Sequence, residues 1–440
     1  MGRLFGTDGV RGVYGRDLTD ELAGARGAAA ARGRGEDGAE RPRFVIGRDT
    51  RGSGPALEAA FADGARSGGA DVLLVGVEPT PAIAFHTAAL RAAAGVVISA
   101  SHNPPAYNGI KFFGPGGTKL PDATEAAIEE AMAADPADVP GAVLPFPDAE
   151  ATYADHVAAC AEAPLTGLRL VVDCANGAAS HVAPMVLRDL GADVVAIHDA
   201  PDGTNINEGC GALHPDVVAA EVVRRGADAG VAFDGDADRA LFADAAGTVI
   251  DGDQVLAACA LGMRDGGRLP GDTVVTTVMA NLGFRLAMRE AGIRVVETQV
   301  GDRYVLEAML AEGARLGGEQ SGHVIFLDQS PTGDGLLTAV RFLSLAVRRG
   351  GGVAGLAAAM TRFPQVLINV PVVDRARLAG TDAVWAAVRA AEDALGDAGR
   401  VLVRASGTED LVRVMVEARS ADDARRSATA IADVVRATCA

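Results

Sequence analysis

Lysine is nearly absent from this sequence: of its 40 lysine and arginine residues, only Lys111 and Lys119 are lysines. Arginine stays charged in nearly every environment, whereas the lysine ammonium is a compact charge whose pKa shifts readily. In a chain that otherwise uses arginine, a lysine indicates a position where that difference matters. This favours a chemical role for Lys111, whereas Lys119 is interpreted as a solvated side chain.

Cysteine is also scarce, and long apolar runs are missing. The five cysteines are odd in number and scattered, with no Cys-x-x-Cys pair, which favours reduced thiols. No apolar run is long enough to cross a bilayer, and residues 1–6 contain no secretory apolar segment. We therefore expect a cytoplasmic location.

Basic residues are too few to balance the acidic ones, and the formal net charge is −18. Such a charge argues against nucleic acid and against anionic membranes as partners. The expected partner is a small molecule, and a homodimer is left open. If that molecule carries phosphate, cations must be concentrated locally, so arginines within glycine-rich motifs carry the most weight.

Strand and helix patterns alternate along most of the chain, which at 440 residues is too long for one core. Buried strands are predicted at residues 43–46, 71–75, 95–98, 168–173, 192–197, 230–233, 273–278 and 293–300, with a helix at 178–190. This alternation is typical of mainly parallel sheets with right-handed crossovers. The fold class is therefore α/β, with three mixed domains expected at residues 1–150, 151–255 and 256–368.

The end of the chain has a different pattern. Strands are predicted at residues 365–372, 400–404 and 411–417, with helices at 382–395 and 421–436. This β-α-β-β-α order predicts a small α+β domain with antiparallel pairing at residues 369–440.

A serine-rich loop, Ser99-Ala-Ser-His-Asn-Pro104, follows the predicted strand 95–98. Asn103 and Pro104 favour a turn, which places Ser101 at the carboxyl end of a strand, where open α/β sheets carry their chemistry. Ser101 is therefore a candidate carrier of phosphate, with Lys111 as its nearby cation. The alternative is an ordinary Ser/Asn/Pro turn.

An acidic loop, Asp234-Gly-Asp-Ala-Asp-Arg239, follows the predicted strand 230–233. Carboxylates at alternate positions, separated by small residues, can converge on one hard cation. The EF-hand pattern is rejected, because Arg239 stands where that loop needs glycine. Arg239 suits a phosphate held near the metal, and the alternative is a solvated acidic turn.

Two later motifs offer substrate contacts. In Gly317-Gly-Glu-Gln-Ser-Gly-His323, Glu319 and Ser321 suit sugar hydroxyls, and His323 is a candidate for proton transfer unless it is simply structural. In the second motif, arginines and hydroxyls around a glycine turn indicate a phosphate cradle, the alternative being a tight hairpin with surface arginines. Its residues are Arg404, Ser406, Gly407, Thr408 and Arg413.

Two further sequence segments each have a simple structural interpretation. Residues 5–12, Phe-Gly-Thr-Asp-Gly-Val-Arg-Gly, are either an N-terminal turn or a loop that turns Arg11 toward a substrate. Asp302 begins a predicted helix and is interpreted as its cap.

Taken together, these motifs resemble those of the phosphoglucosamine mutases, within the α-D-phosphohexomutase superfamily, and they span residues 5–417. The resemblance implies three mixed α/β domains and a TATA-binding-protein-like fourth domain around a central cleft. It implies phosphoserine at Ser101, sugar binding by the third domain and distal phosphate binding by the fourth. Asp234, Asp236 and Asp238 are implied Mg²⁺ ligands, together with an oxygen of the Ser101 phosphate.

The resemblance also implies roles for the remaining motif residues. Proton transfer is implied for Arg11, Lys111 and His323, sugar binding for Glu319 and Ser321, and distal phosphate binding for Arg404, Ser406, Gly407, Thr408 and Arg413. Two positions depart from the family pattern: Ala237 replaces a common glycine, which should be harmless, and Asp410 replaces a usual proline.

The implied reaction interconverts glucosamine 6-phosphate and glucosamine 1-phosphate, with a hexose 1,6-bisphosphate as intermediate and activator. It would feed UDP-N-acetylglucosamine and cell-wall precursor synthesis. The alternatives are a phosphoglucomutase or phosphomannomutase, a metal-dependent sugar phosphatase, and a non-enzymatic sugar-phosphate sensor.

Overall fold

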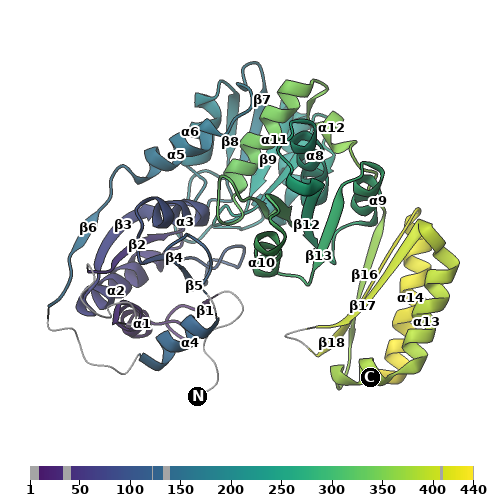
Figure 1. Cartoon of the computed structure of the whole chain (residues 1–440), viewed down its shortest axis with the longest axis horizontal. Helices are drawn as coiled ribbons and strands as arrows, with labels where there is room; N and C mark the ends of the chain where they lie inside the picture. The colour runs from purple at the N-terminus through teal and green to yellow at the C-terminus, as the bar shows by residue number, and fades with distance from the viewer. Residues whose placement is uncertain (1–8, 33–40, 121, 132–138, 407–409, 440) are drawn as a thin grey trace. The chain divides into compact units, whose positions relative to one another are not determined.

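A computed structural model of the chain describes residues 9–32, 41–120, 122–131, 139–406 and 410–439 (Figure 1). The chain divides into two compact units. The first comprises residues Met1–Met279 and Ile293–Ala359, and the second Ala280–Gly292 and Met360–Ala440. Within the described ranges, none of the helices combines the length and the apolar character that a membrane span requires.

The first sheet has six strands in the order β1-β5-β4-β2-β3-β6. The strands are β1 Val10–Val13, β2 Arg43–Arg48, β3 Asp71–Val77, β4 Ala94–Ile98, β5 Tyr107–Phe113 and β6 Val143–Pro145. The helices of this region are α1 Asp20–Arg32, α2 Gly54–Ser67, α3 Thr80–Ala89, α4 Asp122–Glu130 and α5 Ala149–Ala159. Strands β4, β2, β3 and β6 are parallel, whereas β5 runs antiparallel to both β4 and β1.

Side-chain alternation along the central strand explains the helices on both faces of this sheet. Phe44 and Ile46 of β2 belong to a core with Phe61 of α2, whereas Val45 packs with Ile83 of α3. Successive strand residues point to opposite faces, so an uninterrupted apolar run buries both.

Two further sheets complete the first unit. The second has the order β11-β10-β9-β7-β8, with β7 Arg169–Asp173, β8 Asp193–Ile197, β9 Ala229–Phe233, β10 Ala240–Asp244 and β11 Val249–Ile250. The third has the order β13-β12-β14-β15, with β12 Thr273–Thr277, β13 Arg294–Thr298, β14 Leu316–Gly318 and β15 Val324–Phe326. Both combine parallel strands with an antiparallel edge, so the sheets are mixed, as the fold class predicts.

Helices connect these strands. They are α6 Val182–Asp189, α7 Pro215–Arg225, α8 Gly252–Asp265, α10 Asp302–Glu312, α11 Gly335–Arg349 and α12 Gly352–Ala357. Short 3₁₀ turns occupy Gly211–Leu213 and Pro270–Asp272. Asp334 caps α11, its side chain accepting the Leu337 N–H, and thereby fixes the helix start next to the acidic loop that follows β9.

The second unit contains a three-stranded antiparallel sheet in the order β16-β18-β17. Its elements are α9 Leu282–Glu290, β16 Gln365–Pro371, α13 Asp382–Leu395, β17 Gly399–Ala405, β18 Leu411–Ala418 and α14 Ala421–Cys439, with 3₁₀ turns at Arg375–Gly380 and Gly396–Ala398. Alternate residues Val412, Val414 and Val416 of β18 pack with Val388 and Ile431 of the two long helices, which cover one sheet face (Figure 1). The predicted β-α-β-β-α order is confirmed, whereas the predicted domain boundaries stay predictions.

Candidate active site

The loop after β4 holds Ser101 in an unusual conformation. Its φ is +50°, in the left-handed region, and the residue is only 2% exposed. The Ser101 N–H donates to Ser99 Oγ at 2.9 Å, and Ser99 Oγ donates to Asp49 Oδ2 at 2.6 Å. Backbone strain of this kind persists where the surroundings enforce it, which is common at functional sites.

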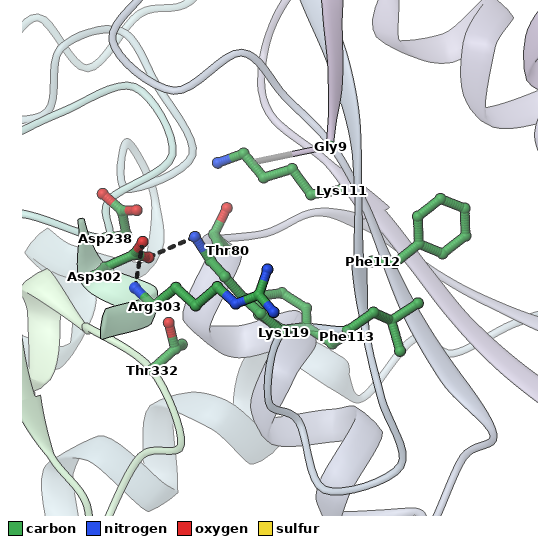
Figure 2. Close-up of a pocket in the computed structure, with 11 residues that line it drawn as sticks. Gly9, Thr80, Lys111, Phe112, Phe113, Lys119, Asp238, Asp302, Arg303 and Thr332 are labelled. Carbon is green, nitrogen blue, oxygen red and sulfur yellow. Dashed lines mark hydrogen bonds and ion pairs between the residues drawn. The ribbon is translucent and has the colours of Figure 1, made fainter. Parts of the chain in front are cut away.

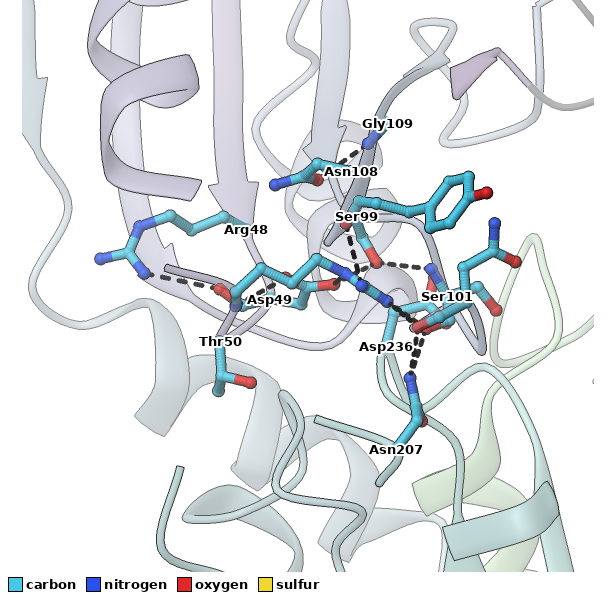
Figure 3. Close-up of polar contacts among 12 residues, drawn as sticks. Arg48, Asp49, Thr50, Ser99, Ser101, Asn108, Gly109, Asn207 and Asp236 are labelled. Atoms are coloured by element: carbon cyan, nitrogen blue, oxygen red, sulfur yellow. Dashed lines mark hydrogen bonds and ion pairs between the residues drawn. The ribbon is translucent and has the colours of Figure 1, made fainter. Parts of the chain in front are cut away.

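A buried arginine enforces this loop conformation. The Arg51 guanidinium, fully buried, donates to Asp49 Oδ2 at 2.9 Å. Its other N–H groups donate to the carbonyls of Ser101, Asn103, Pro104 and Tyr107, at 2.8, 2.8, 2.5 and 2.9 Å. From the loop that follows β8, Asn207 Nδ2 donates to the Ser101 carbonyl at 2.9 Å (Figure 3). Asp49, Arg51 and Asn207 belong to none of the motifs recognised in the sequence, so their roles here were not predicted from it.

The acidic loop after β9 meets this serine. Ser101 Oγ donates to Asp234 Oδ2 at 2.8 Å, and one oxygen from each of Asp234, Asp236 and Asp238 lies within 4.8 Å of the others. The three residues are 1%, 1% and 9% exposed, so the alternative of a solvated acidic turn is wrong.

The acidic loop fits a hard divalent cation. Asp236 Oδ1 and Asp238 Oδ1 are buried oxygens that accept no hydrogen bond from any residue the structure describes. Buried oxygens without donors are costly, and an all-oxygen donor set is the one that Mg²⁺ and Ca²⁺ prefer.

The pKa values of Asp234 and Asp236 are shifted in opposite directions. Burial, and then the charges of Asp238 and Asp236, raise the pKa of Asp234 well above its usual value. Burial also raises the pKa of Asp236, but Lys111 Nζ at 2.8 Å and the Thr80 hydroxyl at 2.7 Å outweigh it, so the pKa is lowered. Asp236 is therefore held as a carboxylate by Lys111.

Arg11 and Arg239 add positive charge at the same place. Arg11, on β1 opposite Gly109 of β5, contributes to the lowered pKa of Asp236. Arg239 Nε lies 3.6 Å from Asp238 Oδ1. Burial by itself lowers the pKa of Arg239, but the three carboxylates outweigh it and raise this pKa overall, so the guanidinium stays charged.

Ala237 occupies a position that favours glycine. Its φ is +56°, a conformation in which a Cβ is strained, while the prediction that alanine is harmless to activity here stays a prediction. Backbone hydrogen bonds impose the conformation, because the Gly335 N–H donates to the Ala237 carbonyl at 3.0 Å and the Thr80 N–H donates to the Asp236 carbonyl at 2.9 Å.

The hairpin between β14 and β15 brings His323 to the acidic loop. His323 is 2% exposed, with Nδ1 3.6 Å from Asp238 Oδ2, and its Nε2 accepts the Gly333 N–H at 3.2 Å. Burial alone lowers the pKa of His323, but Asp238, and then other carboxylates, raise it overall, whereas the Gly333 amide favours the neutral ring. Glu319 accepts the Gly301 N–H at 3.2 Å, and Ser321 Oγ is buried without a hydrogen bond to any described residue.

A pocket opens beside these residues (Figure 2). Its lining includes Lys111, Lys119, Asp238 and Asp302, with Lys119 Nζ 2.5 Å from Asp302 Oδ2. Lys119 is 20% exposed, so its interpretation as a solvated side chain is wrong. Gly301 is the N-cap residue of α10, whereas Asp302 is its first residue and accepts the Arg303 N–H through Oδ1 at 2.8 Å, so Asp302 contributes to the helix start and also pairs with Lys119.

In the second unit, the two arginines of the predicted phosphate cradle face each other across strands. Arg404 of β17 is directly opposite Arg413 of β18. Burial, and then the charge of Arg413, lower the pKa of Arg404. Like charges directly opposite in a sheet are unfavourable, so an anion would relieve this pair. Ser406 is 3% exposed, whereas Gly407 and Thr408 lie outside the described residues.

Comparisons with known proteins identify chains similar to this one. Four families match, described as phosphoglucomutase/phosphomannomutase alpha/beta/alpha domains I, II and III and C-terminal domain, at residues 2–138, 151–247, 251–363 and 367–434. The phosphoglucosamine mutase of Frankia alni is 56% identical over 449 residues, covering 99% of both chains. That of Thermobifida fusca is 54% identical over 443 residues, covering 99% of this chain and 98% of the relative.

Among solved structures, a phosphoglucomutase/phosphomannomutase family protein from Burkholderia thailandensis superposes with a TM-score of 0.83. Its sequence is 26% identical, and the match covers 99% of this chain and 97% of that one.

Proposed function

The chain belongs to the phosphoglucosamine mutases of the phosphoglucomutase/phosphomannomutase family, and on that premise we propose that Ser101 is the phosphoryl carrier in the interconversion of glucosamine 6-phosphate and glucosamine 1-phosphate. The observation that carries the proposal is Ser101 Oγ, 2.8 Å from Asp234 Oδ2 within a buried carboxylate cluster. A strained, braced serine beside a cation site suits repeated gain and loss of a phosphoryl group.

In the forward direction, phosphorylated Ser101 transfers its phosphoryl group to O1 of glucosamine 6-phosphate. The bond between phosphorus and Oγ breaks, a bond to O1 forms, and the O1 proton leaves, which gives a bound 1,6-bisphosphate. The sugar then reorients, the phosphoryl group on O6 returns to Ser101, and O6 regains a proton.

The chain's own residues orient this transfer. Arg51 and Asn207 fix the backbone around Ser101, so that Oγ is already placed before the substrate binds. Arg11, Lys111 and His323 surround the acidic loop and are proposed to serve the proton transfers. Asp234, Asp236, Asp238 and a phosphate oxygen on Ser101 would hold Mg²⁺, which supplies neutralisation of charge on the transferred group.

Substrate contacts are proposed from the remaining motifs. Glu319 and Ser321 would bind ring hydroxyls, and Arg239 a phosphate beside the cation. In the second unit, Arg404 and Arg413 would bind the phosphate that is not being transferred, with Ser406, Gly407 and Thr408 completing the cradle. The opposed guanidinium groups support this, because they gain most from a dianion between them.

The test is a coupled assay on glucosamine, glucose and mannose 6-phosphates, combined with phosphate mapping. We expect the kcat/KM for glucosamine phosphate to exceed that for glucose phosphate at least roughly tenfold, with no net release of inorganic phosphate. Intact-mass and peptide analysis should place phosphate on Ser101 and not on Ser99. A fully active Ser101→Ala variant would overturn the carrier assignment, and steady phosphate release would indicate a phosphatase.

Three expectations from the sequence stay predictions. They are a cytoplasmic location, a homodimer, and supply of UDP-N-acetylglucosamine for cell-wall precursors. Activation by a hexose 1,6-bisphosphate belongs to the same proposal, because that compound would phosphorylate Ser101.

A further inference from the structure

Three side chains with different donor atoms converge behind the active site, at the carboxyl end of β7. Asp173 is the last residue of β7, His198 follows β8, and Cys210 precedes α7. One donor atom of each lies within 4.8 Å of the other two. Asp173 and Cys210 are fully buried, whereas the His198 side chain is 33% exposed.

Hydrogen bonding does not account for this arrangement. His198 Nδ1 lies 3.1 Å from Asp173 Oδ1, yet this buried nitrogen makes no hydrogen bond with any residue the structure describes. The ring nitrogen is therefore close to the carboxylate without being directed at it. Asp173 itself is held in place, because its two oxygens accept the N–H groups of Ala175 and Gly211, each at 3.0 Å.

We propose that Asp173, His198 and Cys210 form a structural site for a divalent transition ion of the Zn²⁺ type. Sulfur, imidazole nitrogen and carboxylate oxygen are the donors of protein zinc sites, whereas Mg²⁺ prefers oxygen alone. Ligand atoms around a tetrahedral Zn²⁺ lie roughly 3.2–3.8 Å apart, which these side chains reach with small movements. The partly exposed His198 marks the side from which the ion, and a water as fourth ligand, would enter.

The thiol adds a proton to the binding equilibrium. Burial, and then the charges of Asp173 and Glu208, raise the pKa of Cys210 to about 12. A metal ion binds the thiolate, so binding releases this proton and strengthens with rising pH.

A bound ion would connect both ends of the loop between His198 and Cys210 to Asp173 at the end of β7. His198 begins this loop and Cys210 ends it. Between them, Asn207 donates to the Ser101 carbonyl at 2.9 Å, and the Gly203 carbonyl accepts the Gly52 N–H at 2.8 Å. A bound ion would therefore steady a segment that braces the Ser101 loop, without touching the substrate.

The experiment uses the full-length protein after chelation, in excess Mg²⁺ so that the acidic loop is saturated, with Co²⁺ as a spectroscopic substitute for Zn²⁺. We expect one equivalent of Co²⁺ to give a sulfur-to-cobalt charge-transfer band. Cys210→Ser should abolish the band, and His198→Gln should weaken Co²⁺ binding at least roughly tenfold. Cys259→Ser, which removes another buried thiol of the same unit, should leave the band unchanged.

Asp236→Asn separates this site from the proposed function, because it disables the acidic loop while sparing the thiol. The band should persist in Asp236→Asn, whether or not the protein proves to be a mutase. Zn²⁺ should also raise the Tm of the parent protein and not that of Cys210→Ser. Absence of the band in the parent, or its persistence in Cys210→Ser, would overturn the proposal, and His198→Gln repeats the test should Cys210→Ser fail to fold.

Discussion

Glu78 provides a sharp test of how the buried charges behave. It lies between β3 and α3, is 2% exposed, and its Oε2 makes no hydrogen bond with a described residue. Burial, and then the charge of Glu150, raise the pKa of Glu78 from 4.5 to about 8. Two residues later, Thr80 donates to Asp236 of the acidic loop.

The raised pKa fixes the sign and the size of the effect. Between pH 4.5 and about 8, folded Glu78 keeps a proton that the unfolded chain releases. The free energy of unfolding therefore falls as pH rises through this window, by about 1.4 kcal/mol per pH unit. Over the whole window the loss is at most about 5 kcal/mol. The glutamine of Glu78→Gln is uncharged in both the folded and the unfolded state, so this variant does not lose unfolding free energy in this way.

The assay compares Tm values of parent and Glu78→Gln at pH 5, 6.5 and 8. We expect nearly equal values at pH 5 and a gain of several degrees for the variant at pH 8. Glu130→Gln, on the exposed part of α4, is the matched control and should show no such trend. A Glu78→Gln gain that is the same at all three pH values would refute the reasoning.

Three further changes probe the site. Asp236→Asn should lose most mutase turnover in Mg²⁺ while circular dichroism stays unchanged; a rate that survives exhaustive chelation would contradict the metal assignment. Arg413→Ala should weaken sugar-phosphate binding about ten- to a hundredfold by calorimetry, since a charged hydrogen bond contributes about 1.5–3 kcal/mol, while Mg²⁺ affinity stays unchanged. Arg51→Lys should lower the Tm markedly, because lysine cannot donate to all four carbonyls that Arg51 reaches. Each buried carbonyl left without a donor costs about 1–3 kcal/mol. An unchanged Tm would show that these Arg51 hydrogen bonds are dispensable.

The sequence could predict those site features that are written in one short segment. Ser101 and the three aspartates each follow a buried strand, so the rule that chemistry gathers at strand ends was enough to select them. The order of strands and helices was likewise predictable from alternation and periodicity. The solvated interpretation of the acidic loop failed because burial depends on what covers the loop, here α11 and the Ser101 loop.

Contacts between distant segments could not be predicted in this way. Arg51 lies 50 residues from Ser101, and Asn207 lies 106 residues away, so no spacing rule connects them. The local sequence around Lys119 and around Asp302 indicates only a solvated side chain and a helix cap. Their ion pair becomes evident only in the folded structure. For Lys119 a signal did exist, because the chain uses lysine at only two positions.

The separation of Ser101 from its carboxylate partner has a consequence for synthesis. The first sheet, Arg51 and the Ser101 loop all come from residues preceding the second sheet, so a nascent chain can form them early. Asp234, which takes the Ser101 hydrogen bond, is added 133 residues later. Until that segment has emerged and folded, Arg51 can hold the Ser101 loop, but neither Asn207 nor Asp234 is there to complete its contacts. The contact between the serine hydroxyl and the acidic loop thus forms only after the second sheet has emerged, and partial chains that end before Asp234 would lack it.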